Sequence, residues 1–258
     1  MKHLLLSLFL TFIYSFLPAQ EFRVPNAVRI LPGDTPGDIL KKAAHVAPTA
    51  RQAAWQELEF TVFIHFGMNT FTDREWGEKG TPASLFNPTA LDAEQWVTTA
   101  KMAGARLLIM VAKHHDGFCL WPSKFTDYSV KSSPWKGGHG DVIAEVAAAC
   151  RKHGMKLGIY LSPWDMSSPV YGTDDYNAYY RNQLTELLTN YGPVDEVWFD
   201  GACGEGPNGK RQVYDWLSYY EVVRRLQPRA VIAVRGPDVR WVGTETGYAR
   251  ETEWSVIP

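Results

Sequence analysis

Short apolar runs that alternate with helical patterns are the feature of this sequence that most limits its fold. Each run is rich in β-branched or aromatic residues and is apolar at successive positions, as expected for a strand buried on both faces. The runs are Phe60–Gly67, Ala105–Lys113, Lys156–Pro163, Glu196–Gly201 and Ala230–Gly236. A half-exposed antiparallel strand would alternate apolar and polar residues, so the sequence predicts a buried parallel sheet.

Helical patterns separate these runs. Asp92 and Asp141 each precede a helical pattern and are candidate N-caps, and Gly154 is a candidate helix end after basic residues. The expected helices are Thr49–Leu58, Leu91–Ala105, Asp141–Gly154, Asp174–Asn190 and Val213–Leu226. Strands and helices that alternate with short connections predict an α/β fold.

Two parallel architectures fit this order of elements, a doubly wound sheet and a (β/α)₈ barrel. The first strand ends in "IHFGMNTF", which is not the glycine-rich phosphate loop of a nucleotide fold. Instead, polar residues stand at nearly every strand end: His65, His114, His115, Tyr160, Asp200 and Arg235. Barrels place their chemistry at the carboxyl ends of several strands, so we expect a TIM-like barrel.

The number of strands is small for a closed barrel. A barrel needs eight strands and about 250 residues. Besides the five runs, "ETEWSV" (Glu251–Val256) is a candidate start of a sixth strand. We therefore expect residues 21–258 to form one barrel domain that is truncated, with its final βα units absent from this chain.

The first twenty residues have the pattern of a secretory signal peptide. Lys2 supplies a positive start, Leu4–Leu17 is apolar, and Pro18 and Ala19 offer a small-residue cleavage site. The apolar stretch is shorter than the roughly 20 residues that span a bilayer. No cysteine lies near the site, which argues against a lipid anchor. We expect an exported protein, periplasmic or extracellular, without a membrane span.

Composition excludes some partners. A formal net charge of -2 gives no electrostatic reason to expect binding to nucleic acid. The 10 tryptophans and 12 tyrosines fit either a packed core or stacking on sugar rings. The three cysteines, Cys119, Cys150 and Cys203, are too widely spaced to indicate a disulfide framework. One bridge is compatible with export, but buried free thiols are the favoured interpretation.

The stretch "MVAKHHDGFCLW" places two histidines and an aspartate directly after an apolar run. A metal site would recruit His65 or Asp116 beside His114 and His115, but consecutive residues of a regular strand point to opposite faces. Packing or loop-capping histidines are a second interpretation. Binding of sugar hydroxyls is the favoured one, because imidazole offers a donor and an acceptor on one rigid ring. It requires a locally irregular strand end.

Asp200 ends the run "DEVWFDG" and is poorly explained as a core residue. It could cap a turn, or it could act as a nucleophile or base, with Trp198 pointing to the same side. Glycosidases usually need a second carboxylate. The candidates in "RGPDVRWVGTETGYARETEW" are Asp238, Glu245, Glu251 and Glu253, although a solvated loop would also explain these acids.

Taken together, these stretches resemble glycoside hydrolase family 29, the α-L-fucosidases. The resemblance rests on "FIHFGMNTFTDREWG", "KHHDGFCLWPSKFTDYSV", "GIYLSPWD", "VDEVWFDGACGEGPNGK" and "GPDVRWVGTETGYARETEW", in the family's order over most of residues 55–255. It implies a (β/α)₈ catalytic barrel, usually followed by a β-sandwich that this chain would lack. It also implies removal of terminal α-L-fucose with net retention and without a metal or other cofactor.

The resemblance also assigns roles to residues. Asp200 matches the nucleophile. The fucose-binding set is matched by His65, Glu75, Trp76, His114, His115, Tyr160 and Trp198. The acid/base varies in position within the family. The "GPDVRWVG-x-E" pattern resembles the branch that prefers α-1,3 and α-1,4 linkages, in which Glu245 would serve, with Glu251 as the alternative.

Three functions therefore compete. The first is a retaining exo-α-L-fucosidase that acts on fucosylated oligosaccharides or glycoconjugates. The second is a non-catalytic glycan-binding protein derived or truncated from such an enzyme. The third is a metal-dependent hydrolase that uses His65, His114, His115 and Asp116, and its activity would be lost with a chelator.

Overall fold

The computed structural model describes residues 26–241. The expected signal peptide, the candidate strand "ETEWSV", and both Glu245 and Glu251 lie outside these residues. The chain divides into two compact units, Met1–Thr49 and Ala50–Pro258. In the first unit, helix α1 (Pro36–Ala43) begins after the N-cap Thr35, whose side chain accepts a hydrogen bond from the backbone N–H of Asp38. The carboxylate of Asp38 bonds back to Thr35 and completes a capping box.

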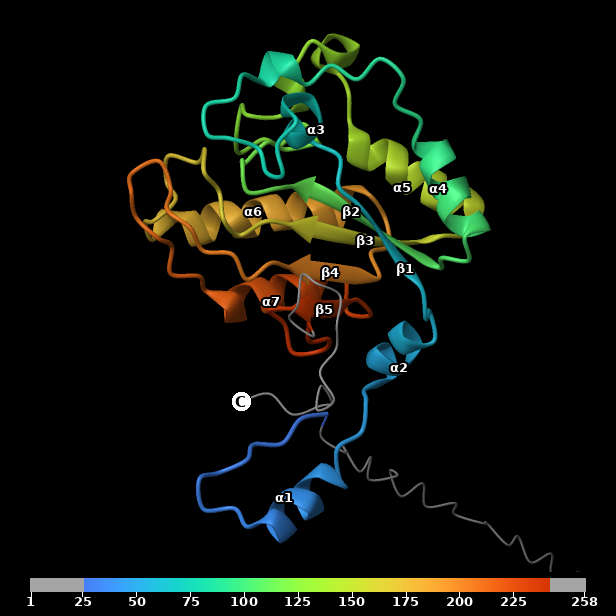
Figure 1. Ribbon diagram of the computed structural model, residues 1–258, viewed down its shortest axis with the longest axis vertical. Helices are drawn as coiled ribbons and strands as arrows, with labels where there is room; N and C mark the ends of the chain where they lie inside the picture. The colour runs from blue at the N-terminus through green and yellow to red at the C-terminus, as the bar shows by residue number, and fades with distance from the viewer. Residues whose placement is uncertain (1–25, 242–258) are drawn as a thin grey trace, which may run out of the picture. The chain divides into compact units, whose positions relative to one another are not determined.

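The second unit is built on a five-stranded parallel sheet with strand order β1-β2-β3-β4-β5 (Figure 1). The strands are β1 (Thr61–Ile64), β2 (Leu107–Lys113), β3 (Lys156–Leu161), β4 (Glu196–Phe199) and β5 (Val231–Val234). Each strand lies within one of the five apolar runs, and every neighbouring pair of strands is parallel. The prediction of a parallel sheet is therefore confirmed. All seven residues of β2 are buried, as the continuous apolar pattern requires.

The helices of this unit alternate with the strands. They are α2 (Ala50–Gln56), α3 (Met68–Thr72), α4 (Ala93–Met102), α5 (Val142–His153), α6 (Asp175–Asn190) and α7 (Trp216–Leu226). Three short 3₁₀ helices, η1 (Ala83–Leu85), η2 (Val130–Ser132) and η3 (Trp135–Gly138), lie in the connections. Among residues 26–241, no helix has the length and apolarity that a membrane span requires.

The predicted helix ends are confirmed by hydrogen bonds. Asp92 caps α4 by accepting from Gln95 N, and Asp141 caps α5 by accepting from Ala144 N. Gly154 ends α5 in the left-handed region, with φ of 66°. Helix α7 starts later than the predicted Val213, because the side chain of Asp215 accepts from Ser218 N and fixes the first turn there.

The core lies on both faces of the sheet. On one face, alternate strand residues such as Leu108, Ile159 and Val197 pack against α4, α5, α6 and α7. The other face carries a separate cluster of Leu107, Ile109, Val111 and Tyr160, with Phe63 and Trp198 packed against it. The three cysteines are free, and two of them, Cys119 and Cys150, are buried, as predicted.

Candidate functional site

The carboxyl ends of four neighbouring strands bring most of the predicted site residues together. His65 follows β1, His114 and His115 follow β2, Tyr160 lies near the end of β3, and Trp198 and Asp200 lie in and after β4. Parallel pairing aligns these ends at one edge of the sheet (Figure 1). Val111, Tyr160 and Trp198 form one row across β2, β3 and β4 on the face opposite the helices.

A bulge at the end of β2 positions the two histidines. Val111 pairs with Tyr160, but Lys113 pairs with Leu161, so Ala112 is an extra residue in the strand. Leu161 belongs to the helix-facing cluster, and Lys113 turns to the same side. His114 and His115 leave the strand together, and their ring centroids are 4.2 Å apart. The irregular strand end that paired histidines require is therefore present.

Asp200 is partly buried, and both of its carboxylate oxygens are held. The Tyr160 hydroxyl donates to Oδ2 at 2.8 Å, and the backbone N–H of Ala202 donates to Oδ1 at 2.8 Å. Gly201 allows the Arg235 side chain to lie against the backbone here, since a Cβ at Gly201 would be 2.9 Å from Arg235 Nε. The result is an oriented carboxylate at the end of β4.

The histidine rings form a compact group beside this carboxylate. The ring centroid of His114 is 5.4 Å from that of His65 and 5.7 Å from the stacked ring of Tyr160. Burial lowers the pKa of His114 to about 3. Burial also lowers the pKa of His115 to about 4, although Asp200 acts in the opposite direction. His115 Nε2 lies 3.9 Å from Asp200 Oδ2, but the imidazole is neutral at neutral pH, so this approach is no ion pair there.

One nitrogen in this group lacks a partner. His114 Nδ1 is buried and makes no hydrogen bond with any residue in the described range 26–241. Buried polar atoms are nearly always satisfied, and exceptions require an explanation. A ligand hydroxyl is one such partner, which makes the nitrogen consistent with a binding role for His114.

Two tryptophans flank His115. The Trp164 ring lies 4.9 Å from the His115 ring, and the half-exposed Trp76 meets His115 edge-on at 5.7 Å. The loop that carries Trp76 is fixed by Gly77, where a Cβ would come within 1.9 Å of Asp116 Oδ2. Glu75, from the same loop, is exposed, and no hydrogen bond or ion pair joins its side chain to the other predicted residues that the structure describes.

Asp116 is buried in the loop that follows the two histidines, where it holds the backbone. It is 2% exposed, and its Oδ1 accepts the backbone N–H of Phe118 at 2.6 Å. Burial raises the pKa of Asp116 to about 6. Within residues 26–241, no three histidine, cysteine, aspartate or glutamate side chains converge in a way that could hold a metal ion.

A buried ion pair beneath the site was not predicted from the sequence. Lys113 Nζ donates to Asp165 Oδ2 and to Gln183 Oε1, each at 2.9 Å, and both charged side chains are at most 1% exposed. Asp165 Oδ1 accepts from Ser168 N and lies so close to Gly117 that a Cβ there would be 2.3 Å away. This pair, whose members are 52 residues apart in sequence, ties the end of β2 to the loop after β3, and the bond to Gln183 adds α6.

Of the four candidates for the second carboxylate, the structure describes Asp238. Asp238, one of the four candidates, is buried, accepts from Ile232 N at 2.8 Å, and forms ion pairs with Arg51 and Arg224. Its hydrogen-bonding capacity is used structurally, which removes it as an acid/base. Glu245, Glu251 and Glu253 lie outside the described residues.

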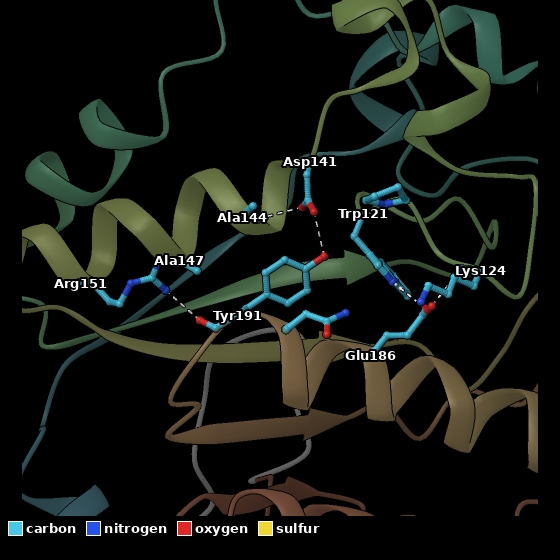
Figure 2. Close-up of a pocket in the computed structure, with 10 residues that line it drawn as sticks. Trp121, Lys124, Asp141, Ala144, Ala147, Arg151, Glu186 and Tyr191 are labelled. Atoms are coloured by element: carbon cyan, nitrogen blue, oxygen red, sulfur yellow. Dashed lines mark hydrogen bonds between the residues drawn. The ribbon is translucent and has the colours of Figure 1, made fainter.

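A cavity of about 370 Å³ lies elsewhere, between α5 and α6 (Figure 2). Several of its polar lining groups bond to one another. Tyr191 donates to Asp141 at 2.9 Å, and Arg151 donates to the carbonyl of Tyr191 at 2.9 Å. Glu186 accepts from Trp121 Nε1 at 2.9 Å. These satisfied groups fasten a loop to two helices, and they include none of the predicted site residues.

The fold and the site place the chain among α/β proteins with a site at the carboxyl ends of parallel strands. In this chain that site contains a carboxylate, imidazoles and aromatic rings. The chain belongs to the alpha-L-fucosidase family, whose model matches residues 80–247.

Individual relatives agree with this assignment. The chain is 52% identical to alpha-L-fucosidase 1 of Arabidopsis thaliana over 212 residues, which cover 81% of this chain and 42% of that protein. A solved glycoside hydrolase family 29 member from an unknown rumen bacterium has a TM-score of 0.74 and 51% identity, and the match covers 78% of this chain and 38% of that one. A Ruminococcus gnavus family 29 fucosidase in complex with fucose has a TM-score of 0.73 and 38% identity, and covers 81% of this chain and 48% of that one.

The likeness to these structures confirms the α/β fold with the parallel sheet of the family's TIM-like barrel domain. The chain spans about two fifths of the length of the curated plant relatives, 42% and 40%. The expectation that the final βα units are absent stays a prediction.

Proposed function

We propose that this chain carries the catalytic site of a retaining exo-α-L-fucosidase that removes terminal α-L-fucose from glycans. Family membership supports the substrate class, and the Ruminococcus gnavus relative at 38% identity binds fucose. The observation that carries the proposal is the Asp200 carboxylate, held by Tyr160 and by the backbone of Ala202 beside the histidine group.

In the proposed mechanism, Asp200 attacks the anomeric carbon as the bond to the departing sugar oxygen breaks. Glu245 protonates that oxygen and later removes a proton from the attacking water. The glycosyl–Asp200 ester then breaks, fucose leaves with retained configuration, and both carboxyls return to their starting states. Both groups act through a transition state with positive charge at the anomeric carbon, which an adjacent carboxylate stabilises.

The remaining predicted residues would bind the sugar or orient the nucleophile. His65, His114 and His115 would bond hydroxyls, while Tyr160 would orient Asp200. Trp76 and Trp198 offer apolar faces for the ring and its methyl group. Glu75 is the least constrained member of the set, because its exposed side chain would have to move toward the sugar.

The substrate preference and location are further parts of the proposal. The "GPDVRWVG-x-E" pattern supports α-1,3 and α-1,4 linkages, as in Lewis-type, milk or mucin sugars. Residues 1–20 support export to the periplasm or the cell exterior. A panel of fucosylated glycans with mass-spectrometric detection would determine the linkage.

The nucleophile is tested with Asp200→Gly. We expect the variant to fold and to lose roughly 10³-fold or more in kcat on an aryl α-L-fucoside. Azide should then restore part of the rate and yield the β-fucosyl azide, because azide can occupy the space of the deleted carboxylate. A variant with nearly wild-type turnover contradicts the assignment. A wild-type protein that binds fucose without turnover would instead favour the non-catalytic glycan-binding alternative.

The acid/base is tested by comparing Glu245→Ala with Glu251→Ala. Loss of the true acid should slow substrates with poor leaving groups far more than activated aryl fucosides, since only poor leaving groups need protonation. We expect this pattern for Glu245→Ala. If it appears in Glu251→Ala alone, the roles of the two glutamates are reversed.

A further inference from the structure

Ser162 makes an unusual pair of contacts directly after β3. It is fully buried, and its Oγ lies 2.7 Å from His115 Nδ1 and 2.7 Å from the backbone carbonyl oxygen of Trp164. No site motif in the sequence includes this serine as a functional residue.

Counting protons assigns the direction of both bonds. A carbonyl oxygen only accepts, so the single Ser162 hydroxyl proton points to Trp164. The serine oxygen must then accept from His115, which places a proton on Nδ1. The Tyr160 hydroxyl also interacts with Ser162. A bond from Ser162 to that oxygen would use the same proton and leave His115 as the donor.

The His115 ring has little freedom to turn over. It is 5% exposed and lies between the rings of His114 at 4.2 Å and Trp164 at 4.9 Å. Its own carbonyl accepts the backbone N–H of Met166 at 2.8 Å. Both the ring and the backbone of His115 are thus held in place, so Nδ1 and Nε2 do not exchange positions.

The other ring nitrogen faces the proposed nucleophile. Nε2 lies 3.9 Å from Asp200 Oδ2. Burial lowers the pKa of His115 to about 4, so the ring carries one proton at neutral pH. With that proton on Nδ1, Nε2 is an acceptor, and two acceptors face each other. A ligand group that contacts both must be a donor, as a sugar hydroxyl is.

We propose that Ser162 is a positioning residue that fixes the Nδ1–H tautomer of His115, so that Nε2 accepts a hydrogen bond from a fucose hydroxyl beside Asp200. The identity of the hydroxyl donor rests on the proposed function. The tautomer does not, because it follows from contacts within the protein.

The tautomer is measured first, in the full chain labelled with ¹⁵N-histidine at pH 7. Two-bond proton–nitrogen spectra distinguish a protonated Nδ1 from a protonated Nε2, and a His115→Asn spectrum assigns the signal. We expect a protonated Nδ1 and a bare Nε2. A protonated Nε2, or an imidazolium, in the wild type overturns the proposal whatever the variants do.

Activity provides the second readout. Ser162→Ala should mix the tautomers and lower kcat/KM on an aryl α-L-fucoside about tenfold, the worth of one hydrogen bond. Ser162→Thr keeps the hydroxyl and should restore both the spectrum and most of the rate. Ser129→Ala is the matched control, since Ser129 Oγ is also buried but makes no hydrogen bond within the described residues.

The outcomes separate this proposal from the proposed function. If Ser162→Ala keeps the wild-type tautomer and rate, Ser162 positions nothing and the proposal fails. If the wild type shows the Nδ1–H tautomer but hydrolyses no fucoside, the proposed enzymatic activity fails while the role of Ser162 in fixing the tautomer stands.

Discussion

Tyr160 and the backbone of Ala202 determine how the Asp200 carboxylate is oriented. Each donates to a different oxygen at 2.8 Å. Hydrogen bonds to a charged group are stronger than neutral ones, about 1.5–3 kcal/mol each. The phenol is buried among aromatic rings, and burial together with the charge of Asp200 raises the pKa of Tyr160 well above 10, so it stays a donor.

Removing this donor should weaken catalysis. We expect Tyr160→Phe to lower kcat/KM on an aryl α-L-fucoside roughly 10- to 100-fold, because Asp200 Oδ2 loses a charge-assisted bond. Tyr128→Phe is the matched control, since the Tyr128 hydroxyl is buried and makes no hydrogen bond with the residues described. Equal, near-wild-type rates for both variants would show that Tyr160 does not orient the carboxylate.

The positions of some site residues could be predicted from the sequence, and those of others could not. Asp200 and the histidines stand at strand ends, so the pattern alone placed them at one edge of a sheet. Ser162 and Asp165 were not predicted, because their partners are 47 and 52 residues away and depend on the bulge in β2. Asp238 looked functional in a loop rich in acids, and only the fold revealed its bonds to Ile232 and two arginines.

At the scale of elements, the strands and long helices were predictable because each has its own apolar period or cap. The five-residue helix α3 was not, since it is too short to show a period. The packing of α2 on the sheet could not be predicted from the sequence either. Trp55 of α2 donates from Nε1 to Glu196 Oε2 at 2.6 Å, at the start of β4 and away from the candidate site.

The burial of Glu196 makes the stability of the protein depend on pH. Burial raises the pKa of Glu196 from 4.5 to about 7, while the bond from Trp55 lowers it. Between these values the folded state keeps a proton that the unfolded state has lost, so the free energy of unfolding falls as pH rises. Glutamine does not titrate, so the Glu196→Gln variant should escape this loss. As the pH rises from 4 to 8, its free energy of unfolding should therefore increase relative to that of the wild type by up to about 3 kcal/mol.

The measurement is the midpoint of chemical denaturation across this pH range. Glu57→Gln serves as the control, because Glu57 is exposed just after α2 and is hydrated in both states. A constant difference between Glu196→Gln and wild type at every pH would show that Glu196 does not retain its proton on folding.

At the scale of the whole molecule, the sheet has two edges in the part of the chain that is described. β1 and β5 each pair with one strand, whereas a closed barrel has no edge. All four residues of β1 are partly exposed, in contrast to the fully buried β2. Unpaired backbone groups along an edge invite pairing with another chain.

The last prediction concerns the 258-residue polypeptide expressed by itself. We expect it to self-associate, because among residues 26–241 β1 pairs with β2 alone, which leaves the backbone groups on its other side next to partly exposed apolar side chains. Light scattering after size-exclusion chromatography should give a mass that rises with concentration. Thr61→Lys, which places a charge on this edge strand, should reduce the association. A wild-type protein that stays monomeric at every concentration tested would show that the edge is already protected.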